Sequence, residues 1–344
     1  MKKTFVKILS LAVATAMLGA CTPKKDQAVD TQSNGADSSD KIKVVASMYP
    51  IYDFTKKIAG DKVDLVNIVP AGTEPHGFEL SSDNMVTLEK ADLLIYNGAG
   101  MESWIEDAKG AVTNDKISYV DTSEGIDLIK NEHQEDADEH EHECEEAHDE
   151  HEGEEAHEEH ECEEHHHHEH GMYDPHIWLG LKEAQMQVTN IKNALVEKDP
   201  TNKDFYEKNY EEYIKKLQDT DKAYEEKLKD FQGRGLVTSH EAFAYLCRDY
   251  GLTQMGIEGV FEDSEPDPAT MKNIIQYIKD NNIKTIFQET LSSSKTVDSI
   301  SKETGATVDV LDPLEGLTKE AEDAGEDYLS IMNKNLDKIV NSFK

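Results

Sequence analysis

The sequence predicts an α/β protein of two lobes, each with a mostly parallel sheet flanked by helices, joined by one long linking helix. Strand-like and helix-like segments alternate in both halves of the 344 residues, which is typical of βαβ units. Between the halves, Asp204 to Phe231 runs without Gly or Pro. In addition, residues 132–170 are rich in His and acidic residues and contain almost nothing apolar.

The first half supplies the elements of one lobe. Strands are predicted at 43–48, 63–69 and 93–96, and helices at 51–59, 83–91 and 101–110. Gly60 ends the first helix, and Asp83 suits the N-cap of the second. The strands are short and rich in β-branched residues, as expected for a buried parallel sheet.

The second half begins with a helix at 182–197, which Pro200 breaks before the long helix at 204–231. The apolar residues of the long helix recur at spacings of three, four and seven, which places them in one stripe. At about 1.5 Å per residue such a helix spans roughly 40 Å, enough to connect two lobes. The remaining strands are predicted at 236–238, 252–257, 284–287 and 307–311, with helices at 242–250, 268–281, 293–304 and 319–343.

The N-terminus reads as a secretory signal peptide. Lysines at positions 2, 3 and 7 precede an apolar run at 8–18, and the sequence Leu18-Gly19-Ala20-Cys21 follows. This ending resembles the bacterial lipobox, which would make Cys21 the lipidated first residue of the mature protein, whereas a plain cleaved signal is the alternative. The predicted organisation is a signal peptide at 1–20, a flexible tether at 21–41, an N-terminal lobe at 42–181, linking helices at 182–233 and a C-terminal lobe at 234–344.

The charge of the chain favours cations as ligands. A formal net charge of −37 repels phosphate and argues against nucleic acid as a partner. Twenty of the acidic residues lie in 132–170, so the rest of the chain carries a formal charge of about −17.

Residues 132–170 form an auxiliary metal-binding loop in our interpretation. A segment this polar has too little apolar surface to pack into a core, but imidazole and carboxylate are zinc ligands. A solvated acidic spacer is the alternative. Cys144 and Cys162 lie in this loop and can form a disulfide or bind metal, whereas Cys247 suits a small buried apolar site. The loop's histidines are His133, His140, His142, His148, His151, His157, His160, His165, His166, His167, His168 and His170.

Three histidines lie outside this loop, at positions 76, 176 and 240. His76 and His240 follow predicted strands, and in open α/β sheets ligands bind beyond the carboxyl ends of the strands. A single histidine in such a position is more often structural, but three together favour a metal site. Glu289 and Asp312 also follow strands and are candidates to complete it.

Four motifs resemble the zinc-binding solute receptors of bacterial ABC importers, a family that includes manganese receptors and metal-binding adhesin lipoproteins. The resemblance covers essentially the whole mature chain. The motifs are Pro75-His76, Asp174-Pro175-His176-Ile177-Trp178-Leu179, Thr238-Ser239-His240-Glu241-Ala242-Phe243-Ala244-Tyr245 and Leu311-Asp312-Pro313-Leu314.

The resemblance implies one metal between the lobes, held by His76, His176, His240 and Asp312, with Glu289 or water as alternative fourth ligands. Three imidazoles favour zinc, whereas the manganese relatives carry a carboxylate at the position of His240. Glu79, Glu241 and Glu289 are candidates to orient the imidazoles, with ordinary surface charge as the alternative.

The expected function is capture of Zn²⁺ outside the cytoplasm, by a lipid-anchored monomer, and its delivery to an ABC permease without catalysis. Manganese or iron as cargo and a metal-dependent adhesin are the alternatives. A zinc hydrolase needs an open metal position, and the sequence contains neither a HExxH helix nor an activated nucleophile. The 132–170 loop would collect zinc or sense its abundance.

Overall fold

The computed structural model describes residues 41–131, 171–261, 266–291 and 295–344. These residues belong to one compact unit, Asp40–Lys344. The predicted signal peptide, the tether with Cys21 up to residue 40, and the 132–170 loop with Cys144 and Cys162 lie outside the described residues. Among the described helices, none is long and apolar enough to cross a membrane.

The first sheet consists of β1 (Lys43–Ala46), β2 (Asp64–Asn67), β3 (Leu93–Tyr96) and β4 (Ser118–Asp121). Its strands are parallel and follow the order β2-β1-β3-β4. Strand β4 was not predicted, because it is a half-exposed edge strand with the polar sequence SYVD. The helices of this lobe are α1 (Tyr49–Ala59), α2 (Ser82–Leu88) and α3 (Ile105–Ala111).

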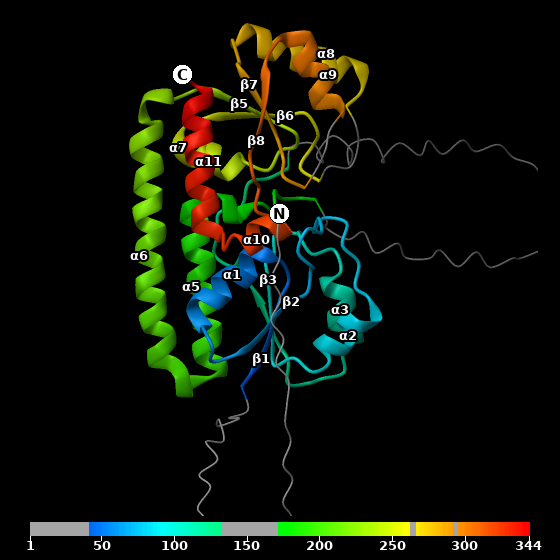
Figure 1. The fold of residues 1–344 in the computed structure, drawn as a ribbon. Coiled ribbons are helices and arrows are strands. Elements are labelled where there is room, and N and C mark those ends of the chain that lie inside the picture. Colours follow the sequence, from blue (N-terminus) through cyan, green and yellow to red (C-terminus); the bar gives the residue numbers. More distant parts are fainter. Residues whose placement is uncertain (1–40, 132–170, 262–265, 292–294) are drawn as a thin grey trace, which may run out of the picture. The chain divides into compact units, whose positions relative to one another are not determined.

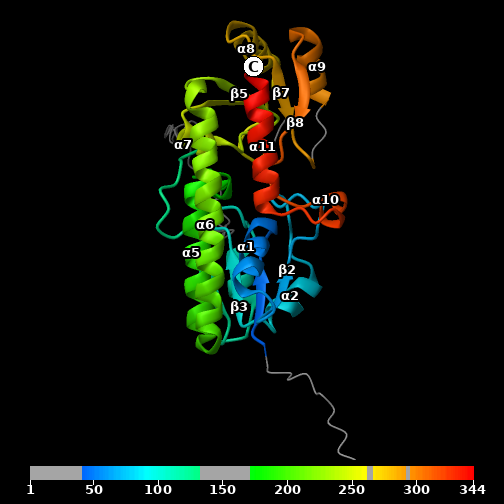
Figure 2. The ribbon, with the colours of Figure 1, turned by 60° about the vertical axis from the view of Figure 1, so that its left-hand side comes forward.

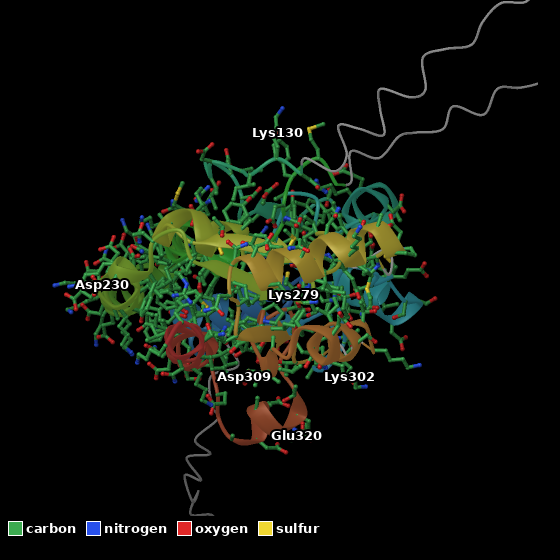
Figure 3. The ribbon with its side chains drawn as sticks, turned by 90° about the horizontal axis from the view of Figure 1, so that it is seen from above. Lys130, Asp230, Lys279, Lys302, Asp309 and Glu320 are labelled. Carbon is green, nitrogen blue, oxygen red and sulfur yellow. The ribbon has the colours of Figure 1, made fainter. Side chains whose placement is uncertain are left out.

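The second sheet repeats this arrangement with β5 (Gly235–Thr238), β6 (Thr253–Gly256), β7 (Thr285–Gln288) and β8 (Thr307–Val310). The strands are again parallel, in the order β6-β5-β7-β8. The helices are α7 (Ala244–Tyr250), α8 (Pro268–Asp280) and α9 (Lys295–Thr304). Seen from above, Lys279 on α8 and Lys302 on α9 mark two helices that pack together (Figure 3).

The long helix predicted between the lobes is α6 (Lys203–Leu228), which lies beside α5 (Leu181–Lys198) (Figures 1 and 2). Short 3-10 turns flank α6 at Pro200–Asn202 and Lys229–Phe231. Helix α6 packs against α1 of the first lobe and against α7 and the C-terminal helix. It therefore contacts elements on both sides, as a linking helix should.

Two helix predictions were wrong in detail. The helix expected at 319–343 is divided into α10 (Lys319–Asp323) and α11 (Tyr328–Ser342). Gly325 between them has a φ of 73°, a conformation that only glycine adopts readily, and the Asp327 carboxylate then caps α11. The N-cap of α2 is Ser81 rather than Asp83, because Ser81 and Asn84 form a reciprocal capping box.

Three apolar clusters hold the sheets in place. One lies between the first sheet and α2 and α3, and another between the second sheet and α8 and α9. The third and largest is shared by both lobes and contains Phe54, Trp178, Phe243 and Tyr328. The two-lobed α/β fold is thus confirmed. The predicted lobe boundaries stay predictions, because the shared core continues across them and does not mark where one lobe ends.

Candidate metal centre

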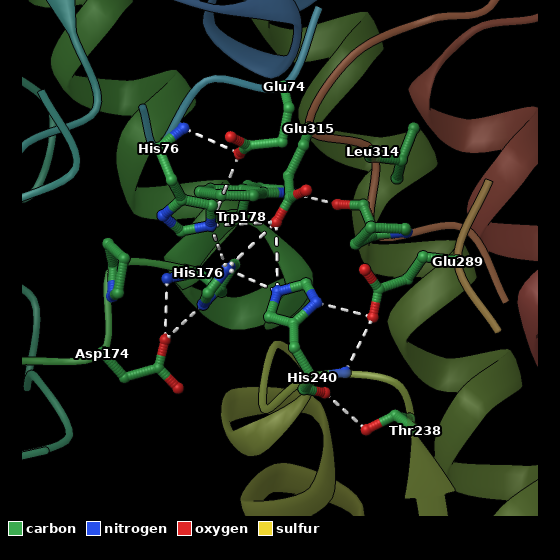
Figure 4. A network of polar contacts seen from close by, with 12 residues as sticks. Glu74, His76, Asp174, His176, Trp178, Thr238, His240, Glu289, Leu314 and Glu315 are labelled. Carbon is green, nitrogen blue, oxygen red and sulfur yellow. Dashed lines mark hydrogen bonds and ion pairs between the residues drawn. The ribbon is translucent and has the colours of Figure 1, made fainter. Parts of the chain in front are cut away.

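Three loops carry the histidines singled out in the sequence, and two of these loops follow strands. His76 lies in the loop between β2 and α2, and His240 lies two residues after β5. His176 directly precedes the 3-10 helix Ile177–Leu179. All three imidazoles converge on one point, together with the carboxylate of Glu315 (Figure 4).

Each of the four side chains contributes one donor atom, and five of the six distances between these atoms are nearly equal. Nε2 of His176 lies 3.1 Å from Nε2 of His76 and 3.2 Å from Nε2 of His240. Oε1 of Glu315 lies 3.1 Å from Nε2 of His176 and 3.3 Å from Nε2 of both other histidines. The side chains are 0–5% exposed, so the group is almost completely removed from water.

Asp312, the fourth member expected from the resemblance, does not belong to this group. Its Oδ1 accepts a hydrogen bond of 2.8 Å from the amide of Leu314, and its own amide donates to Asn335. Leu314 has a φ of 60°, so the chain turns sharply there and presents the next residue, Glu315, to the imidazoles. Asp312 therefore shapes the turn, and Glu315 supplies the carboxylate.

The sequence contains one signal for Glu315, namely the glycine that follows it. A Cβ at Gly316 would lie 3.1 Å from the carbonyl oxygen of Thr73 and 3.2 Å from a methyl carbon of Leu291. A side chain at this position would therefore crowd the loop that carries His76, so glycine favours the close approach. An acidic residue that precedes such a glycine, shortly after a strand, is therefore a candidate metal ligand.

Carboxylates contact the outer nitrogens of two of the histidines. Nδ1 of His176 lies 2.8 Å from Oδ1 of Asp174, which also accepts from the amide of His176. Nδ1 of His240 lies 2.6 Å from Oε1 of Glu289, which accepts from the hydroxyl of Ser239. Two roles were expected for Glu289, as a metal ligand or as a residue that orients an imidazole. Its position suits the second role, and it is not among the four converging side chains.

The other expected orienting residues lie elsewhere. Glu79 is exposed, and Glu241 lines a cavity of about 470 Å³ together with Asp174 and the buried thiol of Cys247. Burial raises the pKa of Cys247 to about 12, which fits the small apolar role predicted for it. Glu74, which the sequence did not single out, accepts a hydrogen bond of 2.7 Å from the amide of His76.

Burial and neighbouring charges act in opposite directions on the pKa values of Glu315 and His176. Burial would raise the pKa of Glu315, but the imidazoles of His240, His176 and His76 outweigh it and hold that pKa well below its usual range. Burial likewise opposes protonation of His176, but the carboxylate of Asp174 raises the pKa of His176. Glu315 is therefore ionised and offers its oxygen to a cation.

Buried imidazole and carboxylate donors that converge between two parallel sheets are typical of a metal-binding receptor. The chain belongs to the ZnuA family, described as zinc-uptake complex component A, periplasmic, whose model matches residues 44–342. The resemblance seen in the sequence is thereby confirmed, and with it the assignment to zinc uptake.

Individual relatives agree with the family. The high-affinity zinc uptake system protein ZnuA of Bacillus subtilis is 39% identical over 312 residues, which cover 91% of each chain. The zinc-binding lipoprotein AdcA of Streptococcus pneumoniae is 35% identical over 336 residues, which are 98% of this chain and 60% of that protein. The Zn(II)-bound ZnuA-like domain of the same AdcA superposes with a TM-score of 0.69 at 33% identity, covering 88% of this chain and 98% of that domain.

Proposed function

We propose that the protein captures Zn²⁺ through His76, His176, His240 and Glu315 and delivers it to an ABC permease in the cytoplasmic membrane. Membership of the zinc-uptake family supports this role. The observation that carries the ligand assignment is the spacing of the four donor atoms.

That spacing fits a tetrahedral zinc ion. In a regular tetrahedron the distance between two ligands is about 1.6 times the distance from metal to ligand, so Zn–N distances of about 2.0–2.1 Å require donors about 3.3–3.4 Å apart. Five of the six donor separations are 3.1–3.3 Å, and all six lie within 4.8 Å. At these five separations a slight widening of the group gives the tetrahedral spacing.

The composition of the group favours zinc over manganese. Three imidazoles and one carboxylate suit Zn²⁺, whereas Mn²⁺ prefers sites rich in oxygen. Four protein ligands also close a tetrahedral site, whereas a catalytic zinc keeps one position for water. A receptor that holds zinc as cargo is therefore the function that this geometry supports, rather than a hydrolase.

The proposed location follows from the N-terminal sequence. A signal peptide at 1–20 and lipidation at Cys21 would hold the monomeric receptor at the outer face of the cytoplasmic membrane. The relative AdcA carries the name lipoprotein, which supports this anchor. Metabolic labelling with a fatty acid tests it: the wild type takes up label, and Cys21→Ala does not. Labelling of both variants contradicts the anchor.

Competition with a chromophoric chelator tests zinc capture by the full chain. We expect one tight zinc per chain that His176→Ala weakens severely, because His176 contacts every other member of the group. His133→Ala is the matched control, since it removes an imidazole from outside the group. The assignment is contradicted if both variants lose the tight site equally, or if neither variant loses it.

Growth in zinc-depleted medium tests delivery. Cells that lack the protein should stop growing when zinc is limiting, and the wild-type gene, but not His176→Ala, should restore growth. Added zinc should rescue all strains. Restoration by the His176→Ala gene at limiting zinc contradicts a transport role for this site.

A further inference from the structure

The segment that leads to His176 begins as one side of a short antiparallel pair. Lys130 pairs with Tyr173, the amide of Asn131 donates to Met172, and the amide of Asp174 donates 2.9 Å to the carbonyl of Ile129. Lys130 lies at the edge of the molecule in the view from above (Figure 3). In a regular ladder the amide of Ile129 would in turn donate to the carbonyl of Asp174.

The hydroxyl of Tyr245 takes the place of that second bond. It accepts a hydrogen bond of 3.1 Å from the amide of Ile129 and donates one of 2.7 Å to the carbonyl of Asp174. The two backbones therefore separate by the width of one hydroxyl group just where the pair ends. Asp174 is the residue at which this separation occurs.

Asp174 is also the residue that orients His176. Its Oδ1 accepts from the amide and lies 2.8 Å from Nδ1 of His176, whose other nitrogen faces Glu315 (Figure 4). A displacement of the Asp174 backbone would tilt the carboxylate and with it the imidazole. Supporting residues of this kind influence metal affinity without touching the ion.

Tyr245 is well suited to fix this position. It is fully buried on α7, five residues after His240, and the guanidinium of Arg248 lies 5.1 Å from the centre of its ring. Burial, followed by the charge of Asp174, raises the pKa of Tyr245, so its hydroxyl keeps the proton that it donates. The hydroxyl thereby connects an element of the second lobe to a ligand loop that precedes α5.

We propose that Tyr245 is a positioning residue of the zinc site, which sets the geometry of His176 through the backbone and carboxylate of Asp174. This inference rests on the proposed function, because it concerns the affinity of that same site. It assigns to Tyr245 a role in zinc binding beyond packing.

Tyr245→Phe removes only the hydroxyl, and Tyr224→Phe is its matched control. The Tyr224 hydroxyl is also fully buried and donates 2.6 Å to a carbonyl, that of Met332, between α6 and α11. We expect Tyr245→Phe to weaken zinc binding by the full chain roughly threefold to tenfold, just below the range of direct supporting residues. Tyr224→Phe should lower the melting temperature about as much as Tyr245→Phe does, but it should leave zinc affinity unchanged.

The spectrum of bound Co²⁺ adds a readout that loss of stability alone does not change. The d–d bands of the Co²⁺-loaded chain report the geometry of the ligands. These bands should shift in Tyr245→Phe and remain at the wild-type position in Tyr224→Phe. Because the spectrum needs only folded protein, it also serves if Tyr245→Phe is produced in small amounts.

A double-mutant cycle with Asp174→Ala tests the route. If Tyr245 acts through the Asp174 carboxylate, Tyr245→Phe should have less effect on zinc affinity once that carboxylate is absent. Wild-type affinity and spectrum in Tyr245→Phe, or fully additive effects in the cycle, would overturn the inference. If the wild type itself lacks a tight zinc site, the proposed function fails instead, so the two failures are distinguishable.

Discussion

Asp312 and Glu315 show how two nearby carboxylates have different tasks. Asp312 holds the turn at Leu314 through its Oδ1, and burial, as the largest effect, raises its pKa. Glu315 lies against three imidazoles and is 3% exposed. The carboxylate that supports the turn is therefore distinct from the carboxylate that faces the metal position.

Substitution of these two residues should separate the tasks. Glu315→Ala should weaken zinc binding by more than about 100-fold, beyond the range of supporting residues, because it removes a donor atom itself. Asp312→Asn retains an oxygen that can accept from Leu314, so its zinc affinity should change less than about tenfold. Chelator competition measures both variants, and the reverse ranking would restore Asp312 as the ligand.

The sequence alone identifies three of the four converging residues. His76, His176 and His240 stand out because every other histidine lies in 132–170 and because two of them, His76 and His240, follow strands. Glu315 did not stand out, because the chain contains 72 acidic residues and its position depends on the left-handed turn at Leu314. A local backbone conformation of that kind has no strong signature in a single sequence.

At the scale of elements, the connection from β3 to α3 depends on one buried acid. The carboxylate oxygens of Glu102 accept hydrogen bonds of 2.8 Å from the amide of Asn97 and 3.0 Å from the amide of Gly98. Asn97 in turn donates to the carbonyl of Pro175, next to His176. Glu102 therefore supports one of the contacts that fix the ligand loop.

The titration of Glu102 should make stability depend on pH. Burial raises the pKa of Glu102 to about 7, from an ordinary value of 4.5. Between these values the folded chain holds a proton that the unfolded chain has lost, so the free energy of unfolding should fall as pH rises, by at most about 1.4 kcal/mol per pH unit. Below the lower value both states are protonated and this contribution is constant.

Denaturant titrations at pH 5 and pH 8 measure this effect against Glu102→Gln. The variant has no proton to lose, so the decrease of its unfolding free energy over this interval should be smaller than in the wild type. Asp53 and Glu183, whose pKa values burial also raises, contribute equally to both proteins. Equal decreases in both proteins would show that Glu102 does not titrate in this window.

Sequence patterns predicted elements best where burial is strong. β3 is buried along its whole length and was predicted with the correct bounds, Leu93–Tyr96. Periodicity does not reveal β4, because an edge strand needs few apolar residues, and it does not reveal the break between α10 and α11, because that break depends on the single residue Gly325. Edges and helix ends depend on tertiary neighbours or single residues, which periodicity does not detect.

At the scale of the whole molecule, a shared core joins the lobes around the site. Trp178 donates 2.7 Å to the carbonyl of Pro313, and its own carbonyl accepts from the hydroxyl of Tyr328. These bonds connect the His176 loop to the C-terminal part of the chain, close to Glu315. The ligand loops are therefore held by the same packing that holds the lobes together.

Removal of residues 132–170 should change zinc stoichiometry without loss of the tight site. Asn131 and Met172 are hydrogen-bonded neighbours, so a Gly-Gly turn can replace the segment. The intact chain, with twelve histidines in that segment, should bind more than one zinc, and the shortened chain one. Equilibrium dialysis gives the number, and one zinc in both proteins would contradict metal binding by the segment.

The most direct measurement of the four-residue site is anomalous diffraction at the zinc edge from crystals of the zinc-loaded protein. We predict one strong peak at about 2.0–2.2 Å from Nε2 of His76, His176 and His240 and from a carboxylate oxygen of Glu315. A strong peak that includes Asp312 in place of Glu315, or that lies away from these histidines, would contradict the account.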